Sequence, residues 1–122
     1  MIKLPQTEEQ LMGYIWDLKE AFSKDILEKY SHPKPAQTTL ATLLKRLTEK
    51  NFISYKMFGN SRAYFPLITK EKYFEQHINT LVETHFNNSA FKFASFFTKK
   101  SKMTKEELTS LKNLVEDQLK KR

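Results

Sequence analysis

The chain has 122 residues, of which 39% are hydrophobic, so it can bury one modest core. This length excludes a large multidomain enzyme. The sequence holds no cysteine, which excludes disulfide bonds, thiol nucleophiles and thiolate metal sites. Its formal net charge of +7 favours an anionic partner, either nucleic acid or a membrane surface.

The positive charge is unevenly distributed along the chain. Residues 1–30 hold four lysines and six acidic residues, whereas residues 31–68 hold six basic residues and a single acid, Glu49. Residues 69–122 hold eleven basic and seven acidic residues. No segment approaches the ~18 apolar residues of a membrane span, and the polar start lacks the apolar run of a signal peptide. We therefore expect a cytoplasmic protein that does not insert into a membrane.

The first thirty residues predict two helices. Thr7–Gln10 has the pattern of a capping box, which predicts that the first helix begins there. Ser23 is expected to cap a second, short helix that must end before Pro33, because a proline disfavours helical geometry in its predecessor. The apolar stripe of the first helix follows three- and four-residue steps: Leu11, Ile15, Leu18 and Phe22.

A third helix is predicted from about Ala36 to Asn51. One side of it is apolar, with leucines at positions 40, 43, 44 and 47. The opposite side carries hydroxyls and a cation, with one acid at its far end: Thr38, Thr42, Lys45 and Glu49. The sequence therefore predicts a helix that buries leucine and exposes polar groups.

A change of period after Asn51 indicates a β-hairpin. Residues 52–58 are rich in aromatic and β-branched side chains, residues 59–62 are expected to form the turn, and residues 63–65 return as a second strand before Pro66. Arg62 is then expected at or near the tip.

The helical period returns from Thr69 to the end of the chain. Paired apolar positions predict a helix through Phe86, and residues 90–97 predict a shorter one. Thr104–Glu107 is a second capping box, which predicts that the last helix begins there.

This order of elements is that of a winged helix-turn-helix fold. Such a fold inserts its third helix into the major groove of DNA and lays the hairpin along the adjacent backbone or minor groove. We therefore predict a mainly α fold with a small β-hairpin, in which a winged helix-turn-helix DNA-binding domain precedes a helical C-terminal region. The residues expected to contact DNA are Thr38, Thr39, Thr42, Lys45, Arg46, Lys56 and Arg62.

Three stretches of the sequence resemble the penicillinase-repressor family of bacterial transcription factors. They are Leu4–Trp16, Thr39–Leu47 with the following Glu49 and Lys50, and Arg62–Ile68. In the tail, the resemblance rests on Glu107, Leu108, Leu111 and Leu114.

The resemblance implies a homodimeric repressor that binds an inverted-repeat operator in double-stranded DNA. Residues 1–68 would form the winged helix-turn-helix domain and residues 69–122 the dimerisation region. The apolar surface of the tail agrees, because exposed patches of this kind mark interfaces. The expected interface consists of Tyr73, Phe74, Ile78, Leu81, Val82, Phe93, Phe97, Leu108, Leu111, Leu114 and Val115.

Two departures from the family pattern bear on how the repressor would be induced. Members controlled by a membrane sensor are cut at an Asn-Phe bond, where this chain has Phe96-Phe97. Copper-responsive members carry cysteine motifs, which this chain lacks. A membrane sensor or protease as signalling partner therefore stays an open alternative, and the inducing signal is unassigned.

Catalysis, cofactors and metals find no support in the sequence. There is no Gly-rich phosphate loop and no nucleophile motif with a base. His77 and His85 share a helix, but their backbones are ~12 Å apart at eight residues' spacing, too far to hold one metal ion. The alternative to DNA binding is a winged-helix module for protein–protein contact, whose basic surface meets an acidic partner. For the polar side of the third helix taken alone, an ordinary solvated surface is an equal alternative, and the hairpin and the family resemblance favour DNA contact.

Overall fold

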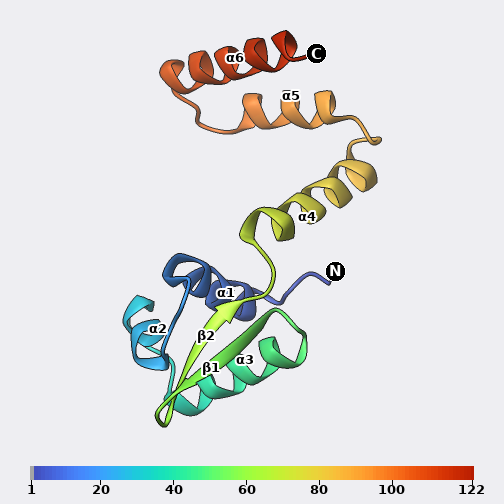
Figure 1. Ribbon diagram of the computed structural model, residues 1–122. Coiled ribbons are helices and arrows are strands. Elements are labelled where there is room, and N and C mark those ends of the chain that lie inside the picture. The colour runs from blue at the N-terminus through green and yellow to red at the C-terminus, as the bar shows by residue number, and fades with distance from the viewer. Residues whose placement is uncertain (1) are drawn as a thin grey trace. The chain divides into compact units, whose positions relative to one another are not determined.

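The computed structural model describes residues 2–122 as two compact units, the first extending to His77 and the second starting at Ile78. The prediction of a mainly helical fold with one small hairpin is confirmed (Figure 1). The elements are α1 (Gln6–Leu18), α2 (Ser23–Lys29), α3 (Gln37–Glu49), β1 (Ile53–Phe58), β2 (Ser61–Pro66), α4 (Lys70–His85), α5 (Ala90–Lys100) and α6 (Lys105–Lys120).

The core of the first unit is built on α1 and α3. Leu11 and Ile15 of α1 are completely buried, as predicted, and so is Met12. The predicted continuation of this stripe to Phe22 is wrong, because α1 ends at Leu18 and Phe22 is the N-cap of α2. All four leucines of α3 are buried too, which confirms the predicted apolar side of that helix. Helix α1 contacts α2, α3 and β2 around this core.

The predicted starts of α1 and α2 are each one or more residues too late. Helix α1 begins at Gln6 and has Pro5 at its N-cap, so Thr7 is already helical and caps nothing. Helix α2 begins at Ser23 itself, and its N-cap is Phe22. A capping side chain needs an extended backbone just outside the helix. Phe22 has that conformation and Ser23 does not, so the capping predictions for Thr7 and Ser23 are wrong.

The hairpin has a tighter turn than predicted. Phe58 pairs with Ser61, so only Gly59 and Asn60 form the turn, and Arg62 lies within β2 opposite Met57. Gly59 has a φ of 61°, which a residue without a Cβ adopts at little cost.

Two backbone hydrogen bonds tie the hairpin to the loop after α1. The Ala21 N–H donates to the Tyr64 carbonyl, and the Tyr64 N–H donates to the Ala21 carbonyl, each over 2.8 Å. Ala21 and Tyr64 are both buried. The hairpin, which is the wing of the fold, is therefore fixed at Tyr64 to the loop after α1. Its tip extends beyond this attachment.

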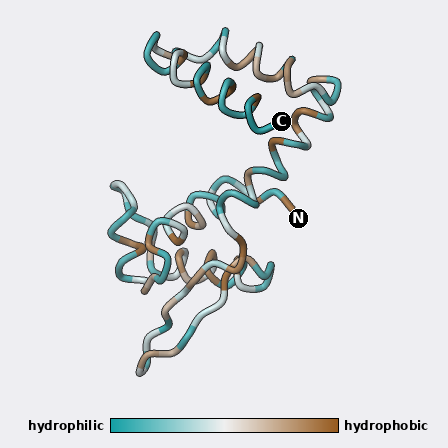
Figure 2. Tube along the Cα trace, turned by 45° about the horizontal axis from the view of Figure 1, so that its top comes forward, coloured by the Kyte–Doolittle hydropathy of each residue, from teal (hydrophilic) through white to brown (hydrophobic). Residues whose placement is uncertain are grey.

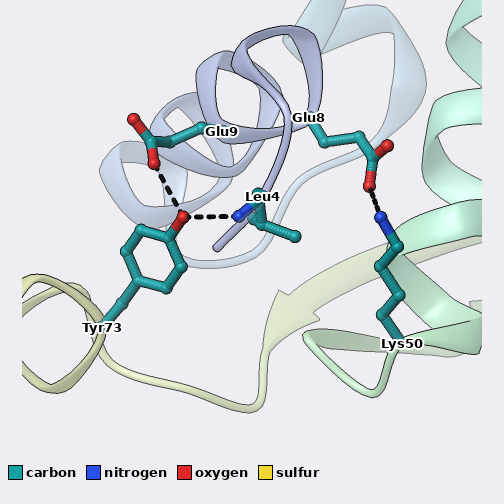
Figure 3. A network of polar contacts seen from close by, with 5 residues as sticks. All are labelled: Leu4, Glu8, Glu9, Lys50 and Tyr73. Atoms are coloured by element: carbon teal, nitrogen blue, oxygen red, sulfur yellow. Dashed lines mark hydrogen bonds and ion pairs between the residues drawn. The ribbon is translucent and has the colours of Figure 1, made fainter. Parts of the chain in front are cut away.

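Tyr73 joins three segments of the first unit (Figure 3). Its hydroxyl accepts a hydrogen bond from the Leu4 N–H over 2.9 Å and donates one to Glu9 Oε2 over 2.7 Å. The ring is fully buried and lies edge-on to Phe52. Burial first, and then the bond to Glu9, raise the pKa of Tyr73 to about 12. Tyr73 was predicted at the dimer interface, and this is corrected, because its own unit encloses it.

A second polar contact crosses the first unit between α1 and the end of α3. Glu8 is 3% exposed, and its carboxylate pairs with the Lys50 ammonium (Figure 3). A buried carboxylate without a partner would be costly, so this pairing makes the position of Glu8 possible. The contact holds the C-terminal end of α3 against the first turn of α1.

Apolar and polar residues alternate along the helices of the second unit (Figure 2). Ser89 caps α5, and the predicted capping box of Thr104 and Glu107 is confirmed at the start of α6. The Phe86 ring contacts Phe93 and Phe96 at centroid distances of 5.4 and 5.5 Å. Helices α5 and α6 are described in full, and neither contains a buried residue.

We predict that Tyr73→Phe removes part of the pH dependence of stability. The pKa of Tyr73 is higher in the folded than in the unfolded protein. The neutral hydroxyl therefore contributes fully to folding stability below pH 10, and this contribution is lost as pH rises to about 12. The loss should be on the order of 2 kcal/mol. At pH 7 the variant should lose about 1–3 kcal/mol, because the Leu4 N–H is left buried and unpaired.

Urea unfolding at fixed protein concentration between pH 7 and 12 measures both effects. Tyr55→Phe is the matched control, because that ring is partly exposed on the hairpin. Parallel stability curves for the wild type and Tyr73→Phe would contradict the assigned role of the hydroxyl.

Candidate nucleic-acid interface

The outer side of α3 displays the hydroxyl and cationic groups that the sequence predicted there. Thr38, Thr39, Thr42, Lys45 and Arg46 are all exposed. The Thr42 hydroxyl donates to the Thr38 carbonyl over 3.0 Å, which leaves its oxygen lone pairs directed to solvent as acceptors. The helix therefore presents both donors and acceptors without withdrawing any of these groups from water.

One acid accompanies these cations. Lys45 Nζ lies 4.0 Å from Glu49 Oε1, and both side chains are mostly exposed. An exposed pair of this kind contributes little to stability and exchanges readily for another anion. Lys45 is thus available to a phosphate.

The two basic residues predicted on the hairpin lie on opposite faces of it. Neighbouring residues along a strand alternate between faces. Because Arg62 pairs with Met57, and Lys56 pairs with Ala63, the two cations project from different sides. Lys56 Nζ lies over the Phe65 ring at 5.6 Å, while Arg62 lies over the Tyr55 ring at 4.4 Å.

Arg62 is oriented by two tyrosines. A hydrogen bond to the Tyr64 side chain, and then the nearby Tyr55 and Tyr64 hydroxyls, raise the pKa of the Arg62 guanidinium above its ordinary value. Like any arginine side chain in a protein, the guanidinium is charged. Its side chain is exposed, with donors available to a phosphate or carboxylate.

A cleft of about 920 Å³ separates α2, α3 and the hairpin. Three of the seven predicted residues line it, namely Thr38, Lys45 and Arg62. The other four, Thr39, Thr42, Arg46 and Lys56, lie outside it on the exposed surfaces of α3 and the hairpin. The predicted set therefore divides into a cleft group and an outer group.

The sequence reasoning missed several cleft residues. Lys24 of α2 and Lys34 of the following loop contribute cations, and Lys34 Nζ donates to the Leu27 and Tyr30 carbonyls over 2.9 and 2.7 Å. Tyr55 and Tyr64 form part of the hairpin wall. Tyr55 and Tyr64 could have been found from the sequence, because a two-residue turn at Gly59 and Asn60 places both tyrosines and Arg62 on one face of the hairpin. No local pattern in the sequence indicates Lys24 or Lys34.

Other kinds of site find no geometric support among residues 2–122. No group of three or more metal-ligating side chains is present in this part of the chain. The His77 ring packs against Tyr73 with a centroid distance of 4.4 Å. No helix in the same range is both long and apolar enough to cross a membrane.

Comparison with known proteins identifies one family. The family model described as penicillinase repressor matches residues 4–117, which is nearly the whole chain and includes both units. Comparison with curated proteins finds no match.

Proposed function

Because the chain belongs to the penicillinase-repressor family of DNA-binding transcriptional repressors, we propose that it acts as a homodimer on an inverted-repeat operator. In this proposal α3 enters the major groove, and the outer and cleft groups of polar residues contact phosphates and base edges. Residues 1–68 supply the DNA contacts and residues 69–122 the pairing of subunits.

The observation that carries the proposal is the two-sided character of α3. Its leucines are buried in the first unit, so the helix cannot turn its polar side inward without exposing them. That polar side is long, cationic and free of bulky apolar residues. A helix of this kind fits the major groove, where Arg and Lys meet guanine edges and Thr meets either base edges or phosphates.

The hairpin supports the proposal through Arg62. This cation lies near the wing tip on the face that looks toward the cleft beside α3. It can therefore follow the DNA backbone or minor groove next to the site where α3 binds. Lys56, on the opposite face of the wing, is the weaker candidate for a contact on the same DNA strand.

The second unit supports the proposed homodimer. Leu81 is 41% exposed, Phe97 50% and Leu114 55%, although these are large apolar side chains. A monomer rarely leaves so many such residues in water on one small unit. A second copy would cover them, and its two-fold symmetry would impose two half-sites on the operator.

Selection of bound sequences from a random duplex pool tests this function. We expect an inverted repeat whose half-sites are separated by about one helical turn or a multiple of it. Binding to it should also weaken steeply as salt increases, because cations on α3 and the wing displace counterions from phosphates. Weak binding at low salt without a preferred sequence would instead favour a module for protein–protein contact.

We predict that Arg46→Ala lowers operator affinity without lowering thermal stability. Arg46 is exposed on α3, so its removal leaves no buried group unpaired. The loss should be about 1–3 kcal/mol if the guanidinium contacts a guanine edge. Lys72→Ala removes one exposed positive charge from α4 and is the matched control. Equal affinity losses in the two variants would mean that only net charge matters.

We also predict that Leu81→Asp converts the protein to a monomer. An aspartate at a covered apolar position would place a charge in the interface without a partner. Sedimentation should report the mass of one chain, while circular dichroism retains at least the helical signal of α1, α2 and α3, whose core lies within the first unit. Asn79→Asp adds the same charge on the opposite side of α4 and should stay dimeric. An unchanged mass for Leu81→Asp would refute the assignment.

A further inference from the structure

The cleft between α2, α3 and the hairpin has the size and form of a ligand site. Its volume of about 920 Å³ lies within the range of small-molecule pockets, roughly 300–1,000 Å³. Three separate elements line it, all within the first unit. It is therefore a concave feature of the fold, which shares Thr38 and Lys45 with the outer side of α3.

The lining combines apolar and aromatic surfaces. On the helical side the accessible apolar surface comes from Leu27 of α2 and Ala41 of α3, because Leu40 and Leu44, which also line the cleft, are only 1% and 2% exposed. Tyr55 and Tyr64 line the hairpin side, with their rings edge to face at a centroid distance of 5.6 Å. A flat ring would contact hydrocarbon on one side and aromatic edges on the other, and both contacts are favourable.

The charged side chains that line the cleft favour a ligand of negative charge. Four basic side chains line it against two acidic ones, Glu28 and Glu49. Lys34 is occupied by backbone carbonyls, and Lys45 is shared with Glu49. Arg62 is different, because its guanidinium lies over the Tyr55 ring at 4.4 Å while its side chain stays exposed. A carboxylate can therefore reach a preorganised, bidentate partner there.

We propose that this cleft binds a small planar aromatic anion, such as an aromatic carboxylate, and that the bound anion competes with DNA. The competition rests on the proposed function, because Thr38, Lys45 and Arg62 line the cleft and also belong to the proposed DNA contacts. Most contacts with DNA go to phosphates and sugars, and phosphates are polar and gain little from apolar surface in the cleft. The small ligand would be an inducer that the fold accommodates without proteolysis of the tail.

The ligand part is tested without DNA, by titrating 2-naphthoate into the ¹⁵N-labelled full-length protein. Amide shifts should concentrate in α2, α3 and the hairpin. Arg62→Gln should weaken binding about tenfold, the loss expected for one charged hydrogen-bonding partner. The neutral isostere 2-naphthylmethanol should bind correspondingly more weakly. Equal binding of acid and alcohol, or shifts confined to residues 78–122, would overturn the proposed ligand class.

Two variants of α3 separate filling of the cleft from a general effect on the helix. Ala41 lines the cleft, so Ala41→Phe should occupy it and abolish 2-naphthoate binding. Thr39→Phe places the same ring outside the cleft and should leave binding intact. Both positions are exposed, so both variants should fold, and Arg62→Gln provides a second test if Ala41→Phe does not. Undiminished binding to Ala41→Phe would contradict the site.

The competition is tested separately with the selected operator. Saturating 2-naphthoate should lower operator affinity of the wild type about tenfold, as expected when one charged contact is withdrawn. Ala41→Phe should bind operator equally with and without 2-naphthoate. If 2-naphthoate occupies the cleft but operator affinity does not change, the inducer role is overturned. If no DNA binds at all, the proposed function fails while the titration still decides the cleft.

Discussion

Four leucines on one side of α3 are removed from water, and their burial sets the rotation of the helix about its axis. Burial of each leucine contributes about 1.5–3 kcal/mol to stability. Rotating the helix so that all four were exposed would therefore cost more free energy than most small domains have as net stability. The threonines and cations on the other side contribute nothing comparable to folding. They are held in position by residues they do not touch, which leaves them free to contact a partner.

Polar contacts between distant segments then close the first unit around that helix. The Tyr73 hydroxyl satisfies both the Leu4 N–H and the Glu9 carboxylate, and Lys50 satisfies the buried Glu8 (Figure 3). Trp16 Nε1 also donates to the Ile68 carbonyl over 2.8 Å, where the chain leaves the hairpin. Each contact joins residues more than forty positions apart. Together they fix α1, the end of α3 and the start of α4 to one core.

The second unit is stabilised differently from the first. Its helices are stabilised locally by caps at Ser89 and Thr104, yet α5 and α6 bury none of their residues. Isolated helices of this length are marginal in water, and most helical stability in proteins comes from packing an apolar face. Burying the exposed apolar side chains of these helices against another surface would therefore add to their stability.

The sequence by itself determined the helices, the existence of the hairpin, the buried side of α3 and the family, because these depend on local periodicity, turn residues and short motifs. The polar side of α3 was predictable for the same reason. Tertiary structure alone decided which predicted residues meet: Arg62 and Lys45 line one cleft, while Lys56 faces elsewhere. It also decided that Tyr73 belongs to the core. These outcomes depend on hairpin register and on contacts between residues far apart in the chain, and no local pattern encodes either.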